Sequence, residues 1–513
     1  MLASFTLVRV LRADRLLLAL TALLSVCTLL PMTGSPFLPF ADLPGNIGQA
    51  GLIWPTALQD GVAAEHYEVA WKPLPYWSAY LFITVVNRIA GPIIAAKLMV
   101  GLLLLMLPLM TMRLLVALNR SPRLGLFAFL LSWEHSLYGG WVTFLLGMNL
   151  ALLALAWIAE ARTPREALKV IPLAAIIALT HVLAVGYLLT AGGLMVFASG
   201  RDFFRRLWLH FVGLSGCLLA IVPWAAKRFG SVSSSSAFVF DLHSPAEKAA
   251  ALFKYTLDND PDVIGGRVSA VAFFVFIACA VMVAGQKQLS VPPFLRRSGI
   301  AILAAAALLY LVLPMGIGGP IGHWYTYPRF ASYLLVGLLL VPMPDLHGAR
   351  AWWLAPAVLA ALALNWSTYR QMRSFGERAG PFVEILELIK PNTRMLPLEL
   401  EDADPSVRAP PFNQFHGYVA AGKAAYDPHL FDNGDIPLHY RGDKRLPQTN
   451  WDTGRNFNLQ DHGRYYDYVL VQGITKDPVR EGSTPEGQSI RLLKEAGRFR
   501  LYEVTNRAPP PAR

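Results

Sequence analysis

Long apolar runs recur along the chain and constrain its fold more than any other feature of the sequence. The clearest are Leu16–Leu30, Ile93–Val116, Trp141–Ile158 and Val268–Ala284. A helix needs about 20 residues to cross the hydrocarbon core of a bilayer, and it satisfies its own backbone there. Apolar residues make up 54% of the 513 residues and charged residues only 15%. The sequence therefore predicts a membrane-embedded all-α bundle and excludes an ordinary soluble domain.

Basic residues gather at the ends of the apolar runs and predict their orientation. Arg9, Arg12 and Arg15 precede the first run, so we expect the N-terminus in the cytoplasm. Further clusters mark the other turns that we assign to the cytoplasm: Arg113, Arg120 and Arg123, then Arg162, Arg165 and Lys169, then Arg201, Arg205 and Arg206, then Lys287, Arg296 and Arg297. This alternation predicts about eleven crossings and a periplasmic C-terminus. Helix orientation then accounts for the formal charge of +11, and a nucleic-acid partner is the weaker interpretation.

Two segments of the predicted bundle are irregular. Leu124–Ser136 is assigned as a short outward crossing. Val170–Ser199 has basic residues at both ends, which predicts a helical hairpin that turns near Thr180–His181. Cys27, Cys217 and Cys279 lie inside apolar runs and indicate no disulfide framework.

The order of segments predicts two domains. Residues 1–368 form the polytopic transmembrane domain. Within it, residues 31–75 form a large first periplasmic loop, and residues 76–90 are too short to span comfortably and predict an interfacial helix. Residues 369–513 form a small soluble periplasmic α/β domain.

Within this C-terminal domain, the apolar pattern predicts a helix over Phe382–Ile389 and another over Ser489–Ala496. Short buried strands are expected at Met395–Leu400, Tyr468–Val471 and Phe499–Val504. The segment Asp402–Arg464 is rich in Pro, Gly, Asp and His, and its pattern predicts no element.

Asp42 is the first candidate for chemistry, because it lies in the first periplasmic loop beside the membrane. A carboxylate in that position can take a proton from an acceptor hydroxyl. Asp also commonly caps a helix N-terminus, and the sequence Phe40-Ala41-Asp42-Leu43-Pro44 leaves both roles open.

Two cations are candidates for binding a phosphate. Lys72 stands in an extended, Pro-rich approach to the interfacial helix, and Arg329 lies in an aromatic loop between two crossings. Either side chain can bind the phosphate of a lipid-linked substrate. Each can equally be an interfacial anchor, Lys72 on ordinary lipid and Arg329 in an aromatic belt.

Other ionisable residues are weaker candidates. Glu134, His135, Glu65 and His66 could supply a second acid or an acceptor contact, and His181 more simply bonds a neighbouring helix. Asp258-Asn259-Asp260 has the DxD form, which recurs by chance. We find no Walker A motif, no GxGxxG after a strand and no metal-spaced Cys/His set. A divalent metal is compatible with the sequence but is not required by it.

Several motifs resemble the GT-C superfamily of membrane glycosyltransferases. They are the early Asp42, the entry Lys72-Pro73-Leu74-Pro75-Tyr76-Trp77, the loop Pro328-Arg329-Phe330 before an apolar helix, and the terminal Gly497-Arg498-Phe499-Arg500-Leu501-Tyr502. Within that superfamily, the motifs resemble those of lipid A aminoarabinose transferases and protein O-mannosyltransferases. Where those relatives often carry a second acid directly after the first, this chain has Leu43-Pro44.

The resemblance implies a function at the periplasmic face of a bacterial inner membrane. It implies an inverting glycosyltransferase that uses a polyprenyl-phosphate-linked sugar, with Asp42 as the general base or acceptor-binding carboxylate and Lys72 on the lipid phosphate. The acceptor would be a lipid, a glycan or a protein. The alternative is a non-catalytic GT-C-like protein that binds a lipid-linked glycan or supports an envelope-assembly complex. A transporter is disfavoured, because the centres of the spans carry almost no charge.

Overall fold

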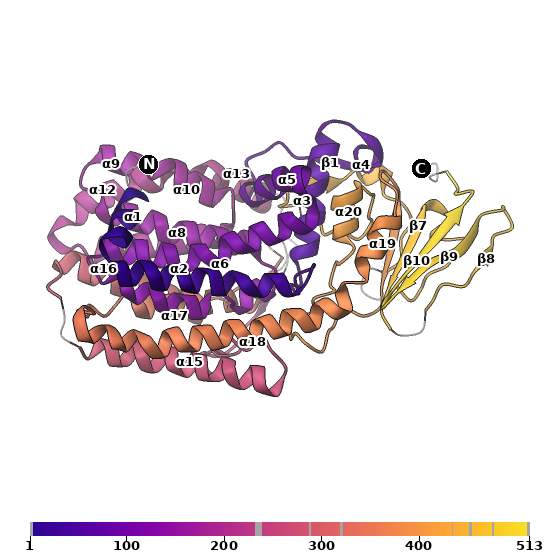
Figure 1. Cartoon of the computed structure of the whole chain (residues 1–513). Coiled ribbons are helices and arrows are strands. Elements are labelled where there is room, and N and C mark those ends of the chain that lie inside the picture. Colours follow the sequence, from indigo (N-terminus) through magenta and orange to yellow (C-terminus); the bar gives the residue numbers. More distant parts are fainter. Residues whose placement is uncertain are drawn as a thin grey trace.

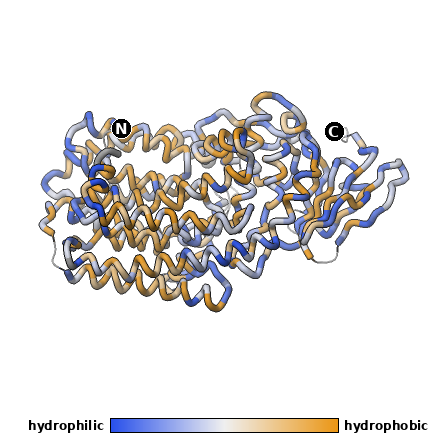
Figure 2. The backbone as a smooth tube through the Cα atoms, viewed as in Figure 1, coloured by the Kyte–Doolittle hydropathy of each residue, from blue (hydrophilic) through white to orange (hydrophobic). Residues whose placement is uncertain are grey.

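The computed structural model describes residues 4–230, 239–286, 289–318, 322–432, 434–450, 454–474 and 477–509. Lys287, from one of the predicted cytoplasmic clusters, lies outside these residues. The described chain forms an elongated helical bundle with a β-sheet domain at one end (Figure 1). Hydrophobic residues run along the bundle, and hydrophilic residues cover its far end and much of the C-terminal domain (Figure 2).

The bundle contains six segments that are long and apolar enough to cross a membrane among the described residues. They correspond to α2 (Arg15–Leu29), α6 (Pro92–Ala117), α8 (Val142–Glu160), the pair α12 (Phe203–Leu214) and α13 (Leu218–Gly230), α15 (Val263–Ala284) and α16 (Pro293–Val312). Shorter apolar helices are α10 (Ile171–Ala178), α11 (Val182–Phe197), α17 (Ala331–Leu339) and the 3-10 helix η2 (Pro122–Leu131). The membrane-embedded helical bundle is therefore confirmed, while the number of eleven crossings stays a prediction.

Further elements complete the bundle. Its remaining helices are α1 (Ser4–Ala13), α3 (Leu43–Ala57), α4 (Gly61–His66), α5 (Trp77–Ala90), α7 (His135–Tyr138), α9 (Pro164–Leu168), α14 (Pro245–Ala250) and α18 (Ala355–Ala379). The short strands β2 (Phe240–Asp241), β3 (Gly316–Ile317) and β4 (His323–Trp324) form an antiparallel sheet in that order. In Figure 1, α15 and α18 lie side by side along one edge of the bundle.

The predicted cytoplasmic turns lie together at one end of the bundle. Arg205 donates to the carbonyl of Arg162 over 2.8 Å. The guanidinium of Arg120 donates to the carbonyls of Leu295 and Arg296 at 3.0 and 3.1 Å. These contacts join clusters that are far apart in the sequence.

The opposite end of the bundle contains the predicted hairpin turn. The backbone breaks between α10 and α11 at residues 179–181, where the carbonyl of Thr180 accepts from the N–H of Tyr76 over 3.1 Å. The spatial grouping of turns thus agrees with the alternation that the basic residues predict.

This grouping carries a prediction about which end faces the cytoplasm. A reporter that is active only in the periplasm should be active when fused after Arg513 and inactive when fused after Arg296, because positive loops are retained in the cytoplasm. Reporter activity is measured in intact cells, with a cytoplasm-active reporter at both positions as the control. The reverse pattern would place the candidate site residues on the cytoplasmic side of the membrane and contradict the predicted topology.

Helix α5 has the character of an interfacial helix. Leu81, Val85 and Ile89 follow one another at intervals of four and are 48%, 51% and 81% exposed. This spacing places them on one face of the helix. An exposed apolar stripe of this kind is typical of lipid contact, so the interfacial placement of residues 76–90 remains our prediction.

The C-terminal domain begins beyond α18. A helix α19 (Phe382–Leu388) precedes a sheet in the order β5-β7-β10-β9-β8. Its strands are β5 (Met395–Glu399), β7 (Tyr468–Gln472), β8 (Gly482–Ser483), β9 (Ser489–Ala496) and β10 (Phe499–Thr505). β5 is parallel to β7, and β7, β10, β9 and β8 pair antiparallel. The predicted helix at Phe382 and the three predicted strands are confirmed, whereas the domain boundary at 369 stays a prediction because α18 continues to Ala379.

The predicted helix at Ser489–Ala496 is wrong, because this segment is strand β9. Its Leu, Lys, Glu and Ala residues favour a helix locally. The partner strand β10 instead pairs with both halves of the segment, on either side of one register shift, and Gly497, at φ +61°, makes the tight turn between the two strands. Tertiary pairing therefore overrides the local helix propensity.

The unassigned segment 402–464 links the C-terminal domain to the first loop. It contains α20 (Gly417–Lys423) and β6 (Leu438–Tyr440), and β6 pairs with β1 (Tyr67–Val69). Helix α20 packs on α3 so closely that a Cβ on Gly48 would lie 2.9 Å from the Cα of Gly417. Two small residues thus permit a backbone contact that holds the domain against the bundle.

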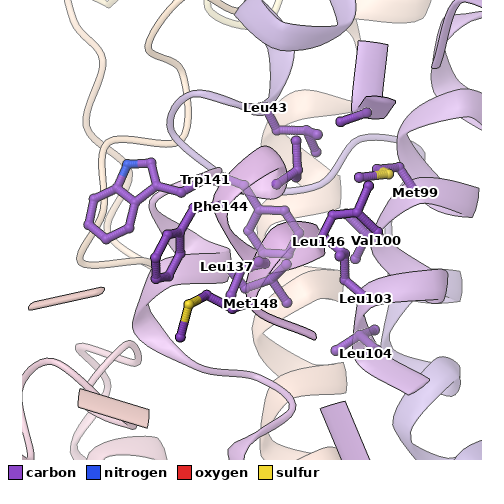
Figure 3. Packing of buried hydrophobic residues seen from close by; sticks show 14 of the residues in the cluster. Leu43, Met99, Val100, Leu103, Leu104, Leu137, Trp141, Phe144, Leu146 and Met148 are labelled. Atoms are coloured by element: carbon purple, nitrogen blue, oxygen red, sulfur yellow. The ribbon is translucent and has the colours of Figure 1, made fainter. Parts of the chain in front are cut away.

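Apolar side chains form the floor beneath this junction. In Figure 3, Leu43 from α3, Met99 and Val100 from α6, and Leu146 from α8 gather in one buried cluster, with Trp141 at its edge. The cluster anchors the start of α3, which follows Asp42 directly.

Candidate active site

A cavity of about 410 Å³ lies where the bundle meets the C-terminal domain. We call it the Asp42 pocket. Residues from distant parts of the chain line it: Asp42, Gly45, Asn46, Gln49, Tyr76, Tyr80, Trp141, Thr143, Gly322, His323, Trp324, Tyr325, Arg329, Asn413, Gln414, Phe431 and Ile436. The pocket therefore brings together two of the predicted site residues, Asp42 and Arg329, which are far apart in the sequence.

Backbone hydrogen bonds fix the position of Asp42. Its N–H donates to the carbonyl of Gly139 at 3.2 Å, and the N–H of Ala41 donates to the carbonyl of Tyr138 at 2.9 Å. The side-chain amide of Asn46 donates to the Asp42 carbonyl at 2.7 Å. The carboxylate is thus carried on a rigid turn, as a catalytic group requires.

The structure decides between the two roles that the sequence left open for Asp42. Asp42 occupies the N-cap position of α3, but its side chain makes no capping hydrogen bond. The carboxylate instead lies in the pocket, where the amide of Asn413 donates to its Oδ1 at 3.3 Å. A capping role is therefore excluded, and the catalytic role remains our prediction.

The surroundings of Asp42 suit a base at neutral pH. Burial raises the pKa of its carboxyl to about 6, although the charge of Arg329 and hydrogen bonds from Trp141 and Asn413 act in the opposite direction. A carboxyl with this pKa is mostly ionised at pH 7 and is more basic than an ordinary aspartate. Both properties favour proton abstraction.

Arg329 is held at the pocket wall by its own loop. Its Nε donates to the carbonyl of Tyr325 at 3.1 Å and its Nη2 to that of Trp324 at 3.3 Å. The guanidinium carbon lies 4.2 Å from the ring centroid of Trp141. This stacking restrains the guanidinium.

His181, at the turn of the hairpin, belongs to the wall behind Arg329. Its Nε2 lies 3.4 Å from Nη1 of Arg329, and its Nδ1 accepts from the N–H of Leu183 at 3.1 Å. Its ring stacks on His323 with centroids 6.0 Å apart. The hairpin turn therefore supports the pocket. The sequence alone predicts only that His181 bonds a neighbouring helix.

Lys72 lies outside the lining of the Asp42 pocket. Its side chain is exposed, and its carbonyl accepts from the indole N–H of Trp77 at 2.8 Å. The short turn of Lys72-Pro73-Leu74 leads directly into α5, whose first residues border the pocket. Its role as a phosphate ligand stays a prediction.

The other predicted site residues are also outside the lining. Glu134 is 2% exposed in the bundle, and His135 contacts Asn259 at 3.2 Å. Glu65 pairs with Arg394 at 3.0 Å, which joins the first loop to the C-terminal domain.

His66 and the DxD segment make structural contacts. Nδ1 of His66 lies 2.5 Å from the carbonyl oxygen of Lys444. Asp258 pairs with Arg408 at 3.0 Å. Within the described part of the chain, no three His, Cys, Asp or Glu side chains are grouped to hold a metal ion.

Asn413 and Gln414 are two of the pocket residues that the sequence analysis did not identify. They come from the segment 402–464, in which the pattern predicts no element. No local signal marks them, because only the packing of α20 on α3 brings them to Asp42. Their presence makes the C-terminal domain part of the site.

The geometry of the turn at Gly140 carries a prediction. Gly140 has φ +75°, and a Cβ there would lie 2.5 Å from the backbone nitrogens of both Asp42 and Leu43. Gly140→Ala should therefore displace Asp42 and lower turnover by about 100-fold, since a small misplacement of a catalytic group can cost that much. Gly186→Ala is the matched control in kinetic assays of the purified protein, because nothing lies within 4 Å of its added Cβ. Equal turnover in the two variants would show that the turn at Gly140 does not position Asp42 for turnover.

Comparisons with known proteins place the fold. Neither the protein-family models nor the curated proteins include a match to this sequence. Among solved structures, the chain is similar to ArnT from Cupriavidus metallidurans bound to undecaprenyl phosphate, with a TM-score of 0.52 and 12% identity over 97% of this chain and 100% of that one. The apo state of the same ArnT matches with a TM-score of 0.51 and 12% identity over 96% of this chain and 98% of that one. The chain therefore has the GT-C fold of ArnT, as its motifs predicted.

Proposed function

We propose that this protein is an inverting glycosyltransferase of the bacterial inner membrane. It would transfer a sugar from a polyprenyl-phosphate-linked donor to a hydroxyl of a periplasmic acceptor. One observation carries the proposal: Asp42, a rigidly held base, and Arg329, a restrained cation, line the same pocket. The similar ArnT structure, solved with undecaprenyl phosphate, supports the class of donor.

The two residues suit the two ends of a single displacement. Asp42 accepts the proton of the acceptor hydroxyl while the hydroxyl oxygen attacks the anomeric carbon. The bond from that carbon to the phosphate oxygen breaks, and its electron pair remains on the phosphate. Arg329 stabilises this developing charge with a guanidinium that is already in place. Attack opposite to the leaving phosphate inverts the anomeric centre.

The apolar surroundings suit a lipid-linked donor. The exposed stripe of α5 lies on the helix whose first turns border the pocket. A polyprenyl chain can therefore lie in the bilayer while its phosphate reaches Arg329. Lys72, just before α5, would meet the same phosphate from the membrane surface.

Mass spectrometry of envelope glycolipids and glycans tests the proposal directly. Membranes from cells with the gene should contain a product, heavier by one sugar residue, that cells without the gene lack. Cells that express Asp42→Asn protein at the same level should also lack it. Identical profiles in all three strains would contradict the enzyme and favour a non-catalytic, glycan-binding protein.

A further inference from the structure

A buried charge network lies in the C-terminal domain, next to α20. His416 is 3% exposed and lies between two carboxylates. Its Nδ1 bonds the carboxylate of Asp427, and its Nε2 lies 3.8 Å from Oε2 of Glu399. Asp427 and Glu399 are 0% and 7% exposed. Burying three ionisable groups is costly, so the network needs a role beyond filling space.

The network holds the segment that reaches the Asp42 pocket. Oε2 of Glu399 also accepts the N–H of Gln414 at 3.0 Å. Gln414 has φ +52°, a conformation that non-glycine residues adopt only when their surroundings hold them there. Glu399 thus connects His416 to a strained turn at the pocket wall.

That turn touches both Asp42 and its helix. Asn413 donates to Oδ1 of Asp42 at 3.3 Å. A Cβ on Gly45 would lie 1.9 Å from Oε1 of Gln414, and one on Gly417 would lie 2.1 Å from the carbonyl oxygen of Pro44. The segment therefore fits the start of α3 with no room to shift.

We propose that Glu399, His416 and Asp427 are positioning residues for the active site. They hold Asn413 and Gln414 as a wall of the Asp42 pocket, so that Asn413 stabilises the ionised carboxylate of Asp42. This inference rests on the proposed function, and it makes the C-terminal domain a working part of the catalytic centre.

The groups around Asp42 determine the direction in which its pKa should change when one of them is removed. Asp42 faces the guanidinium of Arg329 and hydrogen-bond donors from Trp141 and Asn413, and its charge also acts on the hydroxyl of Tyr80. The hydrogen bond from Asn413 lowers the pKa of Asp42. Its loss should therefore raise that pKa.

The network around His416 has its own neighbours. The ring of His429 meets that of His416 with centroids 6.4 Å apart, and the backbone N–H of His429 donates to Asp427 at 3.0 Å. Asp402 acts on Glu399 from the following loop. These groups remain in place in the variants below.

Binding of undecaprenyl phosphate to the purified full-length protein as a function of pH tests the inference. Affinity should fall as pH rises through the pKa of Asp42, because the carboxylate then repels the phosphate. The Asp42→Asn protein provides the reference, because its profile contains the titration of the lipid phosphate and of the other groups at the pocket, such as His323, but not that of Asp42. Asn413→Ala should move the Asp42-dependent midpoint upward by roughly 0.5 to 1 pH unit, as the loss of one hydrogen bond implies.

Variants of the network should reproduce this shift without touching the pocket. His416→Gln should move the midpoint in the same direction as Asn413→Ala, and the double variant should move it no further. Glu399→Gln, which keeps the shape of the side chain, is the second variant in case His416→Gln folds poorly. The matched control is His439→Gln, because His439 pairs with Asp432 at 2.9 Å elsewhere in the same domain.

The outcomes separate this inference from the proposed function. A parental midpoint in folded His416→Gln and Glu399→Gln proteins, together with a shifted one in Asn413→Ala, would overturn the positioning role alone. No shift in Asn413→Ala would overturn the role of Asn413. Failure of the parent protein to bind undecaprenyl phosphate would overturn both the inference and the proposed function.

Discussion

Replacing Asp42 with Asn is expected to lower turnover by about 100-fold or more, the usual contribution of a general base. Asn is nearly isosteric with Asp, but its amide accepts no proton at neutral pH. The amount of folded protein in the membrane should not change, because the Asp42 side chain makes no capping hydrogen bond that the substitution would remove. Turnover is measured as sugar transfer by purified protein, with thermal unfolding as the check on folding.

The same substitution has a signature in the pH dependence. The base acts only when ionised, and its pKa is about 6, so kcat/KM of the parent should decline as pH falls below that value. The decline should disappear from the residual activity of Asp42→Asn. Asp60→Asn is the matched control, because Asp60 also precedes a helix of the first loop without capping it and is exposed. If both variants transfer sugar like the parent, Asp42 is not the base.

Replacing Arg329 with Ala is expected to weaken binding of undecaprenyl phosphate by about 10- to 100-fold, since a charged hydrogen bond in a partly dry site contributes about 1.5–3 kcal/mol. Arg329→Lys should recover only part of the loss, because Lys cannot contact two phosphate oxygens from one rigid plane or stack flat on Trp141. Arg88→Ala is the control, as Arg88 is an exposed cation at the far end of α5. Affinities are measured by titrating the lipid into detergent-solubilised protein.

Lys72 separates a specific phosphate contact from an ordinary membrane anchor. Its exposed side chain lies outside the pocket lining, and exposed charge pairs contribute little. We therefore expect Lys72→Ala to weaken the same binding by less than Arg329→Ala does. Affinity equal to that of the parent would leave Lys72 as a snorkelling anchor, and a loss equal to that of Arg329→Ala would place it in the phosphate site.

The sequence alone determined the features that depend on local physical chemistry. A membrane span must satisfy its backbone hydrogen bonds within itself, so an apolar run such as Ile93–Val116 predicts the helix Pro92–Ala117 closely. Buried strands such as Tyr468–Val471 are readable for a similar reason, because a short apolar run between turn residues has few other solutions. The motifs around Asp42 and Arg329 identified two residues that the structure brings into one pocket.

Only the tertiary structure decided the features that depend on contacts distant in sequence. Ser489–Ala496 is a strand because β10 lies beside it, although its own residues favour a helix. Asn413 reaches Asp42 across 371 positions of sequence, because glycines on α3 and α20 allow the two helices to touch. The sequence was sufficient to predict that Asp42 could occupy the N-cap position of α3. Its carboxylate points into the pocket instead of capping α3. This orientation depends on Asn413, Trp141 and Arg329, which only the fold brings close to Asp42. A sequence pattern records what each residue prefers locally, whereas the partners that decide between two local preferences arrive only with the fold.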